Sequence, residues 1–460
     1  MTRPHVVVIG GGIAGLSAAW TLSRSPSAPR ITVLEAASRL GGKIQTTTFA
    51  GLPVDNAADA FLSTVPAAKS LCDQLGITDQ LHAPDATNAW IWSRGKLRPF
   101  PLGTVLGVPS NVLTLANVIS PVGMVRSLFD LVLPKNVGRR GHDPSIGNLI
   151  RKRLGDEVAD RLIDPLIGGI NAGSIDDLSI RSAAPQVQAL SDAHRSLFWA
   201  AQRKAPKTKN KPSVFLAPSG GMQTLVDTLV ARLRSNGVEL RTNQEVQSLT
   251  RSETQWALTV GNETLAVDGV ILAAPAHQTA SIIRDLDSRT ATLLSSIRFS
   301  SVAMVRMTYR RADVGHALNG SGFVVPAKDR TLVTACSWSS SKWHRLSKPD
   351  EVIFRVSAGR LHDTRAEELG DDVLVKSLHD ELRRALRITG EPTSFDVTRW
   401  NEAFPQYEPG HADRVDLARS FLQAFGPLAL AGASYDGVGI PACITSGEKA
   451  ARQIQESLAT

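Results

Sequence analysis

The sequence predicts an α/β protein in which a parallel sheet flanked by helices is joined to a second, mixed sheet and to a mostly helical part. Three features lead to this prediction. The apolar run 6–9 ends in a glycine-rich turn and a helix-like stretch, the start of a β-α-β unit. Further buried-type strands return only after residue 220. A separate set of alternating strands lies between residues 300 and 357.

The first turn has the spacing of a phosphate-binding loop. It reads Gly10, Gly11, Gly12, Ile13, Ala14 and Gly15 directly after the strand. Gly10 permits a tight turn, Gly12 lets phosphates approach the backbone, and Gly15 lets the helix pack closely on the strand. Phosphates would then face the N–H groups and positive dipole end of the helix.

A second strand, residues 31–34, ends in Glu35, twenty residues after Gly15. A carboxylate at this place accepts hydrogen bonds from both hydroxyls of an adenosine ribose. Strand, loop, helix, strand and acid in this order predict a dinucleotide-binding unit. NAD and FAD share this fingerprint, so both remain open on these residues alone.

The strands that complete the first sheet are predicted much later in the chain. We expect a helix over 224–236, a strand at 238–240, a meander over 245–260, apolar strands over 267–274 and 428–432, and a closing helix over about 444–458. The first domain is therefore discontinuous. It is assigned residues 1–85, 212–290 and 425–460.

Strands at 300–309, 332–338 and 352–357 and a helix at 372–386 predict the second domain. We assign it residues 86–98 and 291–424. Residues 99–211, with a helical stretch at 146–170, form the third part. Chemistry is expected where the two sheets meet.

The chain is basic, with a formal net charge of +8 and a pI near 9.6. Such a charge attracts anions: nucleic acid, anionic lipid or a polycarboxylate. The basic clusters at 135–140 and 203–211 have no aromatic residues between their charges. We therefore interpret both clusters as solvated loops and predict no nucleic-acid binding.

The three cysteines, Cys72, Cys336 and Cys443, are too few and too scattered for a disulfide framework. No two of the ten histidines lie two to five residues apart, so we predict no metal site. The N-terminus enters a strand directly, without a signal-peptide pattern. A cytoplasmic location is therefore expected.

No charged residue occurs between Pro99 and Val125. The stretch is long enough to cross a bilayer, but prolines and glycines interrupt it repeatedly, so a continuous membrane helix is not expected. The remaining interpretations are a wall of an apolar substrate cavity and a shallow, peripheral contact with a membrane.

Shortly after Glu35 the chain reads Arg39, Leu40, Gly41, Gly42, Lys43. This resembles the second phosphate-proximal motif of glutathione-reductase-like flavoproteins, especially their amine oxidase and porphyrinogen oxidase branch. The resemblance favours FAD over NAD. An exposed glycine turn with flanking charges is the alternative.

The end of the chain carries a more selective motif. Residues 431–444 read Ala-Gly-Ala-Ser-Tyr-Asp-Gly-Val-Gly-Ile-Pro-Ala-Cys-Ile. Matching segments precede it in the expected order, at 164–166, 171–173, 219–222 and 404–411. Together they resemble the flavin-dependent protoporphyrinogen/coproporphyrinogen oxidase family over essentially the whole chain. The family implies a Rossmann-type, glutathione-reductase-like FAD-binding domain of the amine oxidase superfamily, a mixed-sheet substrate domain and a helical domain.

The resemblance also implies the residues that would bind noncovalent FAD. Besides the first glycine turn at the pyrophosphate, they are Glu35 and Ala36 at the ribose, Arg39, Gly42 and Lys43 near the phosphates, the loop Ala57, Ala58, Asp59, Ala60, Val246 at the adenine, and Gly437, Val438, Gly439, Ile440 against the flavin ring. Trp400 is expected to pack close to the flavin, with simple core packing as the alternative.

The chain departs from the family at three places. Residues 57–60 replace a frequent Gly-Pro-Asp-Ser, Ala442 replaces a common aspartate, and Ser63-Thr64-Val65 replaces a basic pair. The missing pair leaves the anchoring of a substrate carboxylate open. Lys96 and Arg98, just before the uncharged segment, are the candidates, and ordinary surface charges are the alternative.

The implied reaction oxidises a porphyrinogen, by hydride transfer from a bridging carbon to the flavin and loss of a pyrrole N–H proton. Dioxygen reoxidises the flavin, and three rounds remove six electrons and release hydrogen peroxide. The enzyme mainly has to position the carbon, so no obligatory base is expected. Asp59 and His411 are weak candidates for proton transfer, and Cys443 is expected to be packed rather than bonded to flavin.

The basic charge favours the tetracarboxylate coproporphyrinogen III in heme biosynthesis over the dicarboxylate protoporphyrinogen IX. Protoporphyrinogen IX as the physiological substrate, another amine oxidase-like activity and a noncatalytic flavoprotein are the alternatives. A heme-pathway enzyme is a candidate partner.

Overall fold

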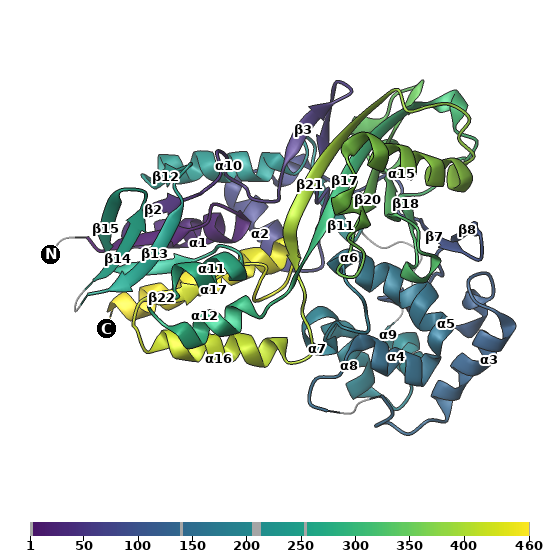
Figure 1. The fold of residues 1–460 in the computed structure, drawn as a ribbon, viewed down its shortest axis with the longest axis horizontal. Coiled ribbons are helices and arrows are strands. Elements are labelled where there is room, and N and C mark those ends of the chain that lie inside the picture. Colours follow the sequence, from purple (N-terminus) through teal and green to yellow (C-terminus); the bar gives the residue numbers. More distant parts are fainter. Residues whose placement is uncertain (1–2, 139–140, 205–212, 253–254, 460) are drawn as a thin grey trace.

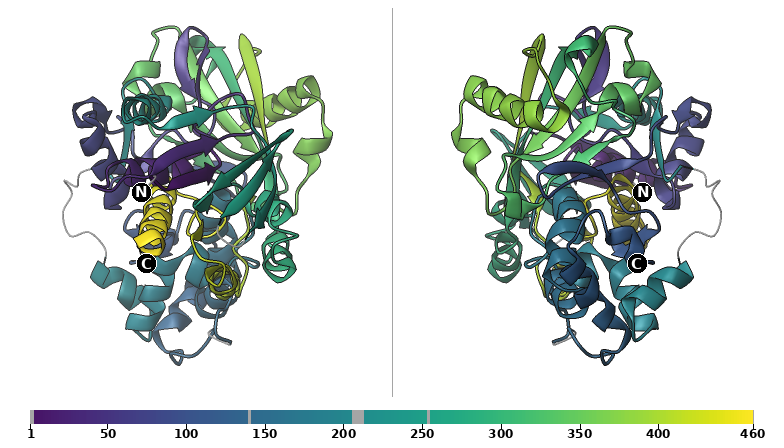
Figure 2. Two further views of the ribbon diagram at one scale, coloured as in Figure 1. Left: turned by 90° about the vertical axis from the view of Figure 1, so that its left-hand side faces the viewer. Right: turned by 90° about the vertical axis from the view of Figure 1, so that its right-hand side faces the viewer.

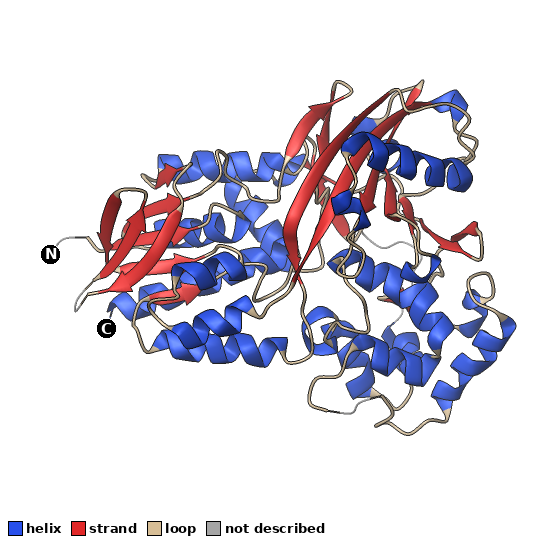
Figure 3. Cartoon of the chain, in the orientation of Figure 1, coloured by secondary structure: helices blue, strands red, loops and turns tan. Residues whose placement is uncertain are grey.

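The computed structural model describes residues 3–459 except 139–140, 205–212 and 253–254. Two sheets lie side by side along the longest axis of the molecule, and a block of helices lies below the second sheet (Figures 1 and 3). Both termini lie at the far end of the first sheet (Figure 2).

The first sheet has five parallel strands in the order β12-β2-β1-β16-β22. Its strands are β1 His5–Ile9, β2 Arg30–Leu34, β12 Glu239–Arg241, β16 Gly269–Leu272 and β22 Leu428–Leu430. The late segments complete the sheet begun by β1, as predicted. The expected strand 267–274 divides between the end of β15 and the shorter β16.

Helices cover one face of this sheet and a meander with further helices covers the other. The first group comprises α1 Ile13–Ser23, α2 Pro66–Leu75, α10 Gln223–Ser235 and α17 Ile440–Ala459. The second comprises β13 Val246–Arg251, β14 Trp256–Val260, β15 Glu263–Val267, α11 Ala276–Ile282, α12 Ser288–Ser295 and α16 His411–Gln423. Because α12 and α16 share this core, their packing joins them to the first sheet, although most of their residues fall in the predicted second domain.

The closing helix α17 begins at Ile440, four residues before the predicted start. Pro441 stands in its first turn, where the missing N–H costs no intrahelical hydrogen bond. The predicted start at about residue 444 was therefore too late, since Pro441 opens the helix.

Short strands connect the first sheet to the second. The hairpin β3 Thr46–Phe49 and β4 Leu52–Asp55 leans against the second sheet (Figure 1). A small sheet of β5 Phe61–Leu62, β11 Phe215–Pro218 and β6 Leu81–His82 lies nearby.

The second sheet has seven strands in the order β21-β17-β20-β19-β18-β7-β8. They are β7 Ala89–Ser93, β8 Lys96–Pro99, β17 Phe299–Arg310, β18 Gly322–Val324, β19 Val333–Trp338, β20 Glu351–Ala358 and β21 Ser394–Pro405. Only β7 and β18 pair in parallel. Helix α15 Asp371–Leu386 packs on one face, and the short helices α13 Ser339–Lys342 and α14 Arg365–Glu368 flank the sheet.

The third part is helical, as predicted. It contains α3 Pro121–Leu128, α4 Ile146–Leu154, α5 Asp156–Val158, a π-helical stretch Ala159–Gly168, α6 Gly169–Asn171, α7 Ile180–Ala183, α8 Pro185–Ala193 and α9 Leu197–Lys204. The π-helical stretch accommodates Pro165, whose missing N–H would break a regular α-helix. The parts of the predicted basic clusters at 139–140 and 205–211 lie outside the described residues.

The uncharged segment 99–125 is broken into the short strands β9 Thr104–Val105 and β10 Val108–Pro109, a 3₁₀ turn and the start of α3. In the described chain, no helix combines the length and the apolar composition needed to cross a bilayer.

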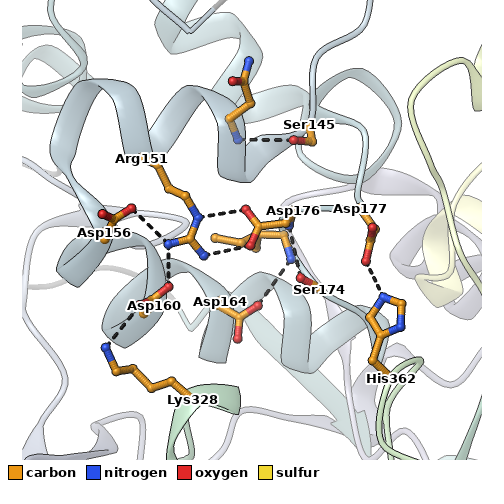
Figure 4. A network of polar contacts seen from close by, with 12 residues as sticks. Ser145, Arg151, Asp156, Asp160, Asp164, Ser174, Asp176, Asp177, Lys328 and His362 are labelled. Atoms are coloured by element: carbon orange, nitrogen blue, oxygen red, sulfur yellow. Dashed lines mark hydrogen bonds and ion pairs between the residues drawn. The ribbon is translucent and has the colours of Figure 1, made fainter.

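Ion pairs attach the helical part to the second sheet (Figure 4). Asp160 pairs with Lys328 at 3.2 Å, and Asp177 contacts His362 at 2.6 Å. Asp160 also shares Arg151 with Asp156 and Asp176. These contacts fix one side of the junction between the helices and the sheet.

One fully buried ion pair closes the core of the helical part. Arg153 Nε donates to Asp130 Oδ1 at 2.6 Å, and Asp130 also accepts from Ser196 Oγ and Phe198 N. Its removal would leave a buried guanidinium without its counter-charge.

We predict that Asp130→Ala lowers the free energy of unfolding by about 3–5 kcal/mol, because an unpaired buried charge is costly. Urea unfolding followed by circular dichroism measures the effect. Asp156→Ala is the matched control: Asp156 pairs with Arg151 at the surface, so it should cost less than about 1 kcal/mol. Equal losses in the free energy of unfolding for the two variants would contradict the conclusion that Asp130 balances a buried charge.

Candidate functional site

The glycine turn after β1 has a different steric demand at each position. Gly10 has φ of +108°, and an added Cβ would lie 2.8 Å from the backbone of Ala273. A Cβ on Gly15 would overlap the Gly10 carbonyl oxygen, whereas a Cβ on Gly12 would meet nothing within 4 Å. The turn is therefore closed on the protein side and open in front of Gly12, at the N-terminus of α1. Such an opening fits a phosphate group.

Glu35 is held in place at the end of β2, beside this turn. Its carboxylate accepts hydrogen bonds from Gly11 N at 2.7 Å and Ala37 N at 2.8 Å. Ala36, the residue between Glu35 and Ala37, is exposed. The arrangement agrees with the expected ribose position, which remains a prediction.

The second glycine loop contacts the first. Gly41 N donates to Gly11 O at 2.8 Å, and a Cβ on Gly42 would lie 3.1 Å from Gly12 Cα. Arg39 uses its guanidinium to donate to the carbonyls of Leu40, Gly42 and Ile44. These hydrogen bonds stabilise the loop and explain the position of the Arg39 side chain without a contact to phosphate. Such a contact remains a prediction.

Lys43 directly follows the second glycine loop in the chain. Its side chain is exposed, yet desolvation by surrounding protein lowers the pKa of its ammonium group. Its charge is also felt by the Cys443 thiol and by His277, whose pKa is lowered mainly by burial. Lys43 therefore lies close enough to Cys443 and His277 for its charge to act on both side chains.

The C-terminal turn, residues 437–439, leads into the N-terminus of α17, whose Cys443 lies close to Lys43. Gly437 has φ of +129°, Val438 is partly exposed, Gly439 is exposed, and α17 begins at Ile440. Asp436 holds the turn through Arg419 at 2.7 Å and through Ser446. Contact of residues 437–440 with a flavin ring remains a prediction.

Trp400 links the second sheet to the loop 57–60. It pairs with Val302 in the sheet, and its Nε1 donates to Asn56 O at 3.3 Å. Ala57 and Ala60 are partly exposed and Ala58 is exposed. Val246 is buried at the start of β13, near the backbone contact of Gln244 N with Glu35 O. The ligand contacts of all these residues remain predictions.

The seven-stranded sheet presents a partly open row that sequence reasoning missed. Met304, Ser357, Ala335 and Val324 are neighbours across β17, β20, β19 and β18. All four are only partly buried, although these are inner strands, and their neighbours on the other face form the α15 core. Val324 also packs against the core of the helical part, so the row lies on the face of the sheet that is turned toward the helices.

Asp59 is an ion-pair partner in this structure. Lys342 Nζ lies 2.9 Å and Arg355 3.2 Å from its carboxylate, and Trp343 Nε1 donates to it at 3.2 Å. Despite its burial, these cations and hydrogen bonds hold the pKa of Asp59 well below its usual range. A carboxylate that stays ionised is a poor proton shuttle, so the candidacy of Asp59 for proton transfer is not supported.

His411 is buried at the start of α16 and lies 4.4 Å from Tyr407, ring centre to ring centre. Neither ring nitrogen has a hydrogen-bond partner among the described residues. Burial, with Arg414, lowers the pKa of His411 to about 4. A proton-transfer role is not supported, because the ring is neutral and enclosed.

The substrate candidates Lys96 and Arg98 lie on β8, the outer strand of the second sheet. Lys96 is exposed, and Arg98 Nε donates to Ser93 O at 3.2 Å. The strand register continues the row of Ala335 and Val324 through Ile91 to Arg98, whereas Lys96 lies outside this row. Binding of a substrate carboxylate by either residue remains a prediction.

The three cysteines are all buried and unpaired. Among the described residues, no group of three or more histidine, cysteine or acidic side chains could hold a metal ion.

Comparison with known proteins adds the family context. The family model for flavin containing amine oxidoreductases matches residues 13–455. A Mycobacterium leprae protein named coproporphyrinogen III oxidase is 34% identical over 100% of both chains, and a Bacillus subtilis protein of that name is 32% identical over 97% of both. A crystal structure from Exiguobacterium sp. 255-15, described provisionally as a protoporphyrinogen oxidase, superposes with a TM-score of 0.88 at 28% identity, covering both chains completely.

The buried, neutral His411 predicts a pH-dependent stability. The unfolded chain takes up its proton near pH 6.5, and the folded protein near pH 4. Stability is therefore lost as the pH falls from about 6.5 toward about 4. We expect His411→Gln to remove about 2 kcal/mol of the stability loss between pH 7 and pH 5.

Urea unfolding at both pH values measures this difference. The exposed His344 supplies the matched variant, His344→Gln, which should keep the wild-type pH slope. A His411→Gln protein with an unchanged slope would show that the imidazole does not titrate as described.

Proposed function

The chain belongs to the flavin containing amine oxidoreductase family, and we propose that it binds FAD noncovalently and oxidises coproporphyrinogen III to coproporphyrin III in heme biosynthesis. Full-length similarity to proteins named coproporphyrinogen III oxidase is the observation that carries the substrate assignment. The open position in front of Gly12, at the N-terminus of α1, supports the cofactor assignment.

The glycine turns would hold FAD as follows. The N-terminus of α1 with Gly10–Gly15 would bind the pyrophosphate, and Glu35 the ribose. The turn 437–440 at the start of α17 would lie against the flavin ring, where helix N–H groups favour the added electron density of a reduced ring. Buried in its pocket, Cys443 has a thiol pKa raised to about 12, which supports a noncovalent cofactor.

The bound flavin supplies hydride acceptance and transfer of the electrons to dioxygen, which releases hydrogen peroxide. The protein side chains position the substrate. The partly buried row Met304, Ser357 and Ala335 would offer a wall for a tetrapyrrole, on the face of the sheet that is turned toward the helical part. Neither Asp59, which stays ionised, nor the enclosed His411 is suited to act as a general base, which fits a reaction controlled by positioning.

Protoporphyrinogen IX is the second candidate substrate, because the Exiguobacterium structure carries the provisional protoporphyrinogen oxidase description. The net charge of +8 favours the tetracarboxylate. We further propose a cytoplasmic enzyme, with a peripheral membrane contact and a heme-pathway enzyme as candidate partners.

We predict that Gly12→Ala weakens FAD binding at least about tenfold, since the added methyl group would enter the space proposed for the pyrophosphate and one lost charged hydrogen bond costs about 1.5 kcal/mol. Gly370→Ala is the matched control. Both glycines cap a helix at an ordinary φ (−72° and −63°) with open space around the Cβ position. Titration of the apoprotein with FAD, read by flavin fluorescence, measures both affinities.

Oxidation tests the proposed function itself. Purified protein with FAD should form coproporphyrin III and hydrogen peroxide from coproporphyrinogen III in air faster than the autoxidation control, and faster than it oxidises protoporphyrinogen IX. A higher kcat/KM for protoporphyrinogen IX would select the second candidate. No rate above autoxidation with either substrate, in protein that retains its flavin, would contradict the proposal.

A further inference from the structure

A cluster beside the proposed flavin loop contains more positive than negative charge. Lys342 and Arg355 both contact the single carboxylate of Asp59, with the lysine ammonium at 3.0 and 2.9 Å from its two oxygens. Two cations facing one carboxylate leave one positive charge in excess.

The neighbouring charges do not cancel this excess. Arg345 pairs with Asp55 at 2.7 Å, and Arg306 pairs with Asp396 at 2.5 Å. Each of these arginines already has its own carboxylate, so neither adjacent acid serves Lys342 or Arg355. An excess charge in a largely enclosed place is costly unless an anion joins it.

The cluster keeps donors available for such an anion. Arg355 Nε is buried and has no hydrogen-bond partner among the described residues. An ammonium group has three N–H donors, and the Asp59 oxygens occupy two of those of Lys342. The side chains of Lys342 and Arg355 are 16% and 10% exposed, so the cluster is open on one side.

The surroundings of the opening are apolar. Lys342 Nζ lies 5.9 Å from the ring centre of Phe215, which pairs with Leu62 across β11 and β5. Both of these large side chains are about 40% exposed. Arg355 lies two residues before Ser357 on the same face of β20, next to the partly open row of the second sheet. A carboxylate joined to an apolar body suits this combination.

We propose that Lys342 and Arg355, held in position by Asp59, form the subsite that binds one propionate carboxylate of the tetrapyrrole. This inference rests on the proposed function and names the anchor of the same site. It also accounts for the segment 63–65, which follows β5 and carries no cation: the positive charge reaches this side of the site from α13 and β20 instead. Asp59 is a positioning residue in this subsite.

The test compares Lys342→Gln with Lys348→Gln in the FAD-loaded enzyme. Lys348 contacts Glu351 and Ala50 O, outside the subsite, so its variant removes the same charge from a nearby place. For Lys342→Gln we expect KM for coproporphyrinogen III and Kd for the product coproporphyrin III to rise about tenfold, with kcat changed less than twofold. Lys342→Arg should restore most of the affinity, and Lys348→Gln should match the wild type.

A second measurement needs no variant. In wild-type enzyme, saturating coproporphyrin III should protect Lys342 from acetylation by a water-soluble acetylating reagent, while Lys348 stays reactive, as read by peptide mass spectrometry. If the wild type turns over coproporphyrinogen III but Lys342→Gln keeps wild-type KM and Kd, or Lys342 is not protected, the subsite is wrong and the proposed function stands. If the wild type oxidises neither porphyrinogen, the proposed function itself fails.

Discussion

The site depends on a close approach of helices at positions without side chains. A Cβ on Gly15 would overlap the Gly10 carbonyl, and a Cβ on Gly447 would overlap the Ala14 carbonyl. Helices α1 and α17 therefore pack directly on one another and on the turn after β1. The crossing lies at the start of α1 and about two turns into α17, so the packing fixes the N-terminus of each helix relative to the other. The first N–H groups of each helix have no intrahelical partner. The second glycine loop contacts the turn after β1 through Gly41 and Gly42.

The junction of the two sheets follows a different rule. Asp55 and Asp59 are buried at the end of β4 and in the loop after it. Asp59 pairs with Lys342 of α13 and Arg355 of β20, and Asp55 pairs with Arg345 in the turn that follows α13. Buried carboxylates require such partners, so these acids hold the second sheet over the first. The same contacts gather cations beside the loop 57–60. Structural pairing and the proposed substrate recognition thus use one set of charges.

Local signals in the sequence predicted a large part of this molecule. The glycine turns, the strands of the first sheet, three strands of the second sheet and the helical middle part follow from short apolar patterns and glycine spacing, and the structure contains them. Strands β7, β8, β18 and β21 of the second sheet were not predicted. The helix start at Ile440 was placed too late, although a proline suits the first turn of a helix.

The partners of individual charges were beyond the sequence. Lys342 lies 283 residues from Asp59, and no periodicity connects the two. Arg39 satisfies three loop carbonyls within five residues of itself, a conformation that its expected role near phosphate did not suggest. The open row of Met304 and Ser357 appears only when the sheet register is known.

Under the proposed function, the N-termini of α1 and α17 and the row of Met304 and Ser357 would enclose one flavin and its substrate. A crystal structure of the protein purified with its flavin and soaked with coproporphyrin III would show whether they do. We expect the pyrophosphate in front of Gly12, the flavin ring against residues 437–440 and the porphyrin between that ring and Met304. A flavin bound elsewhere, or a porphyrin on the far side of the second sheet, would contradict this expectation.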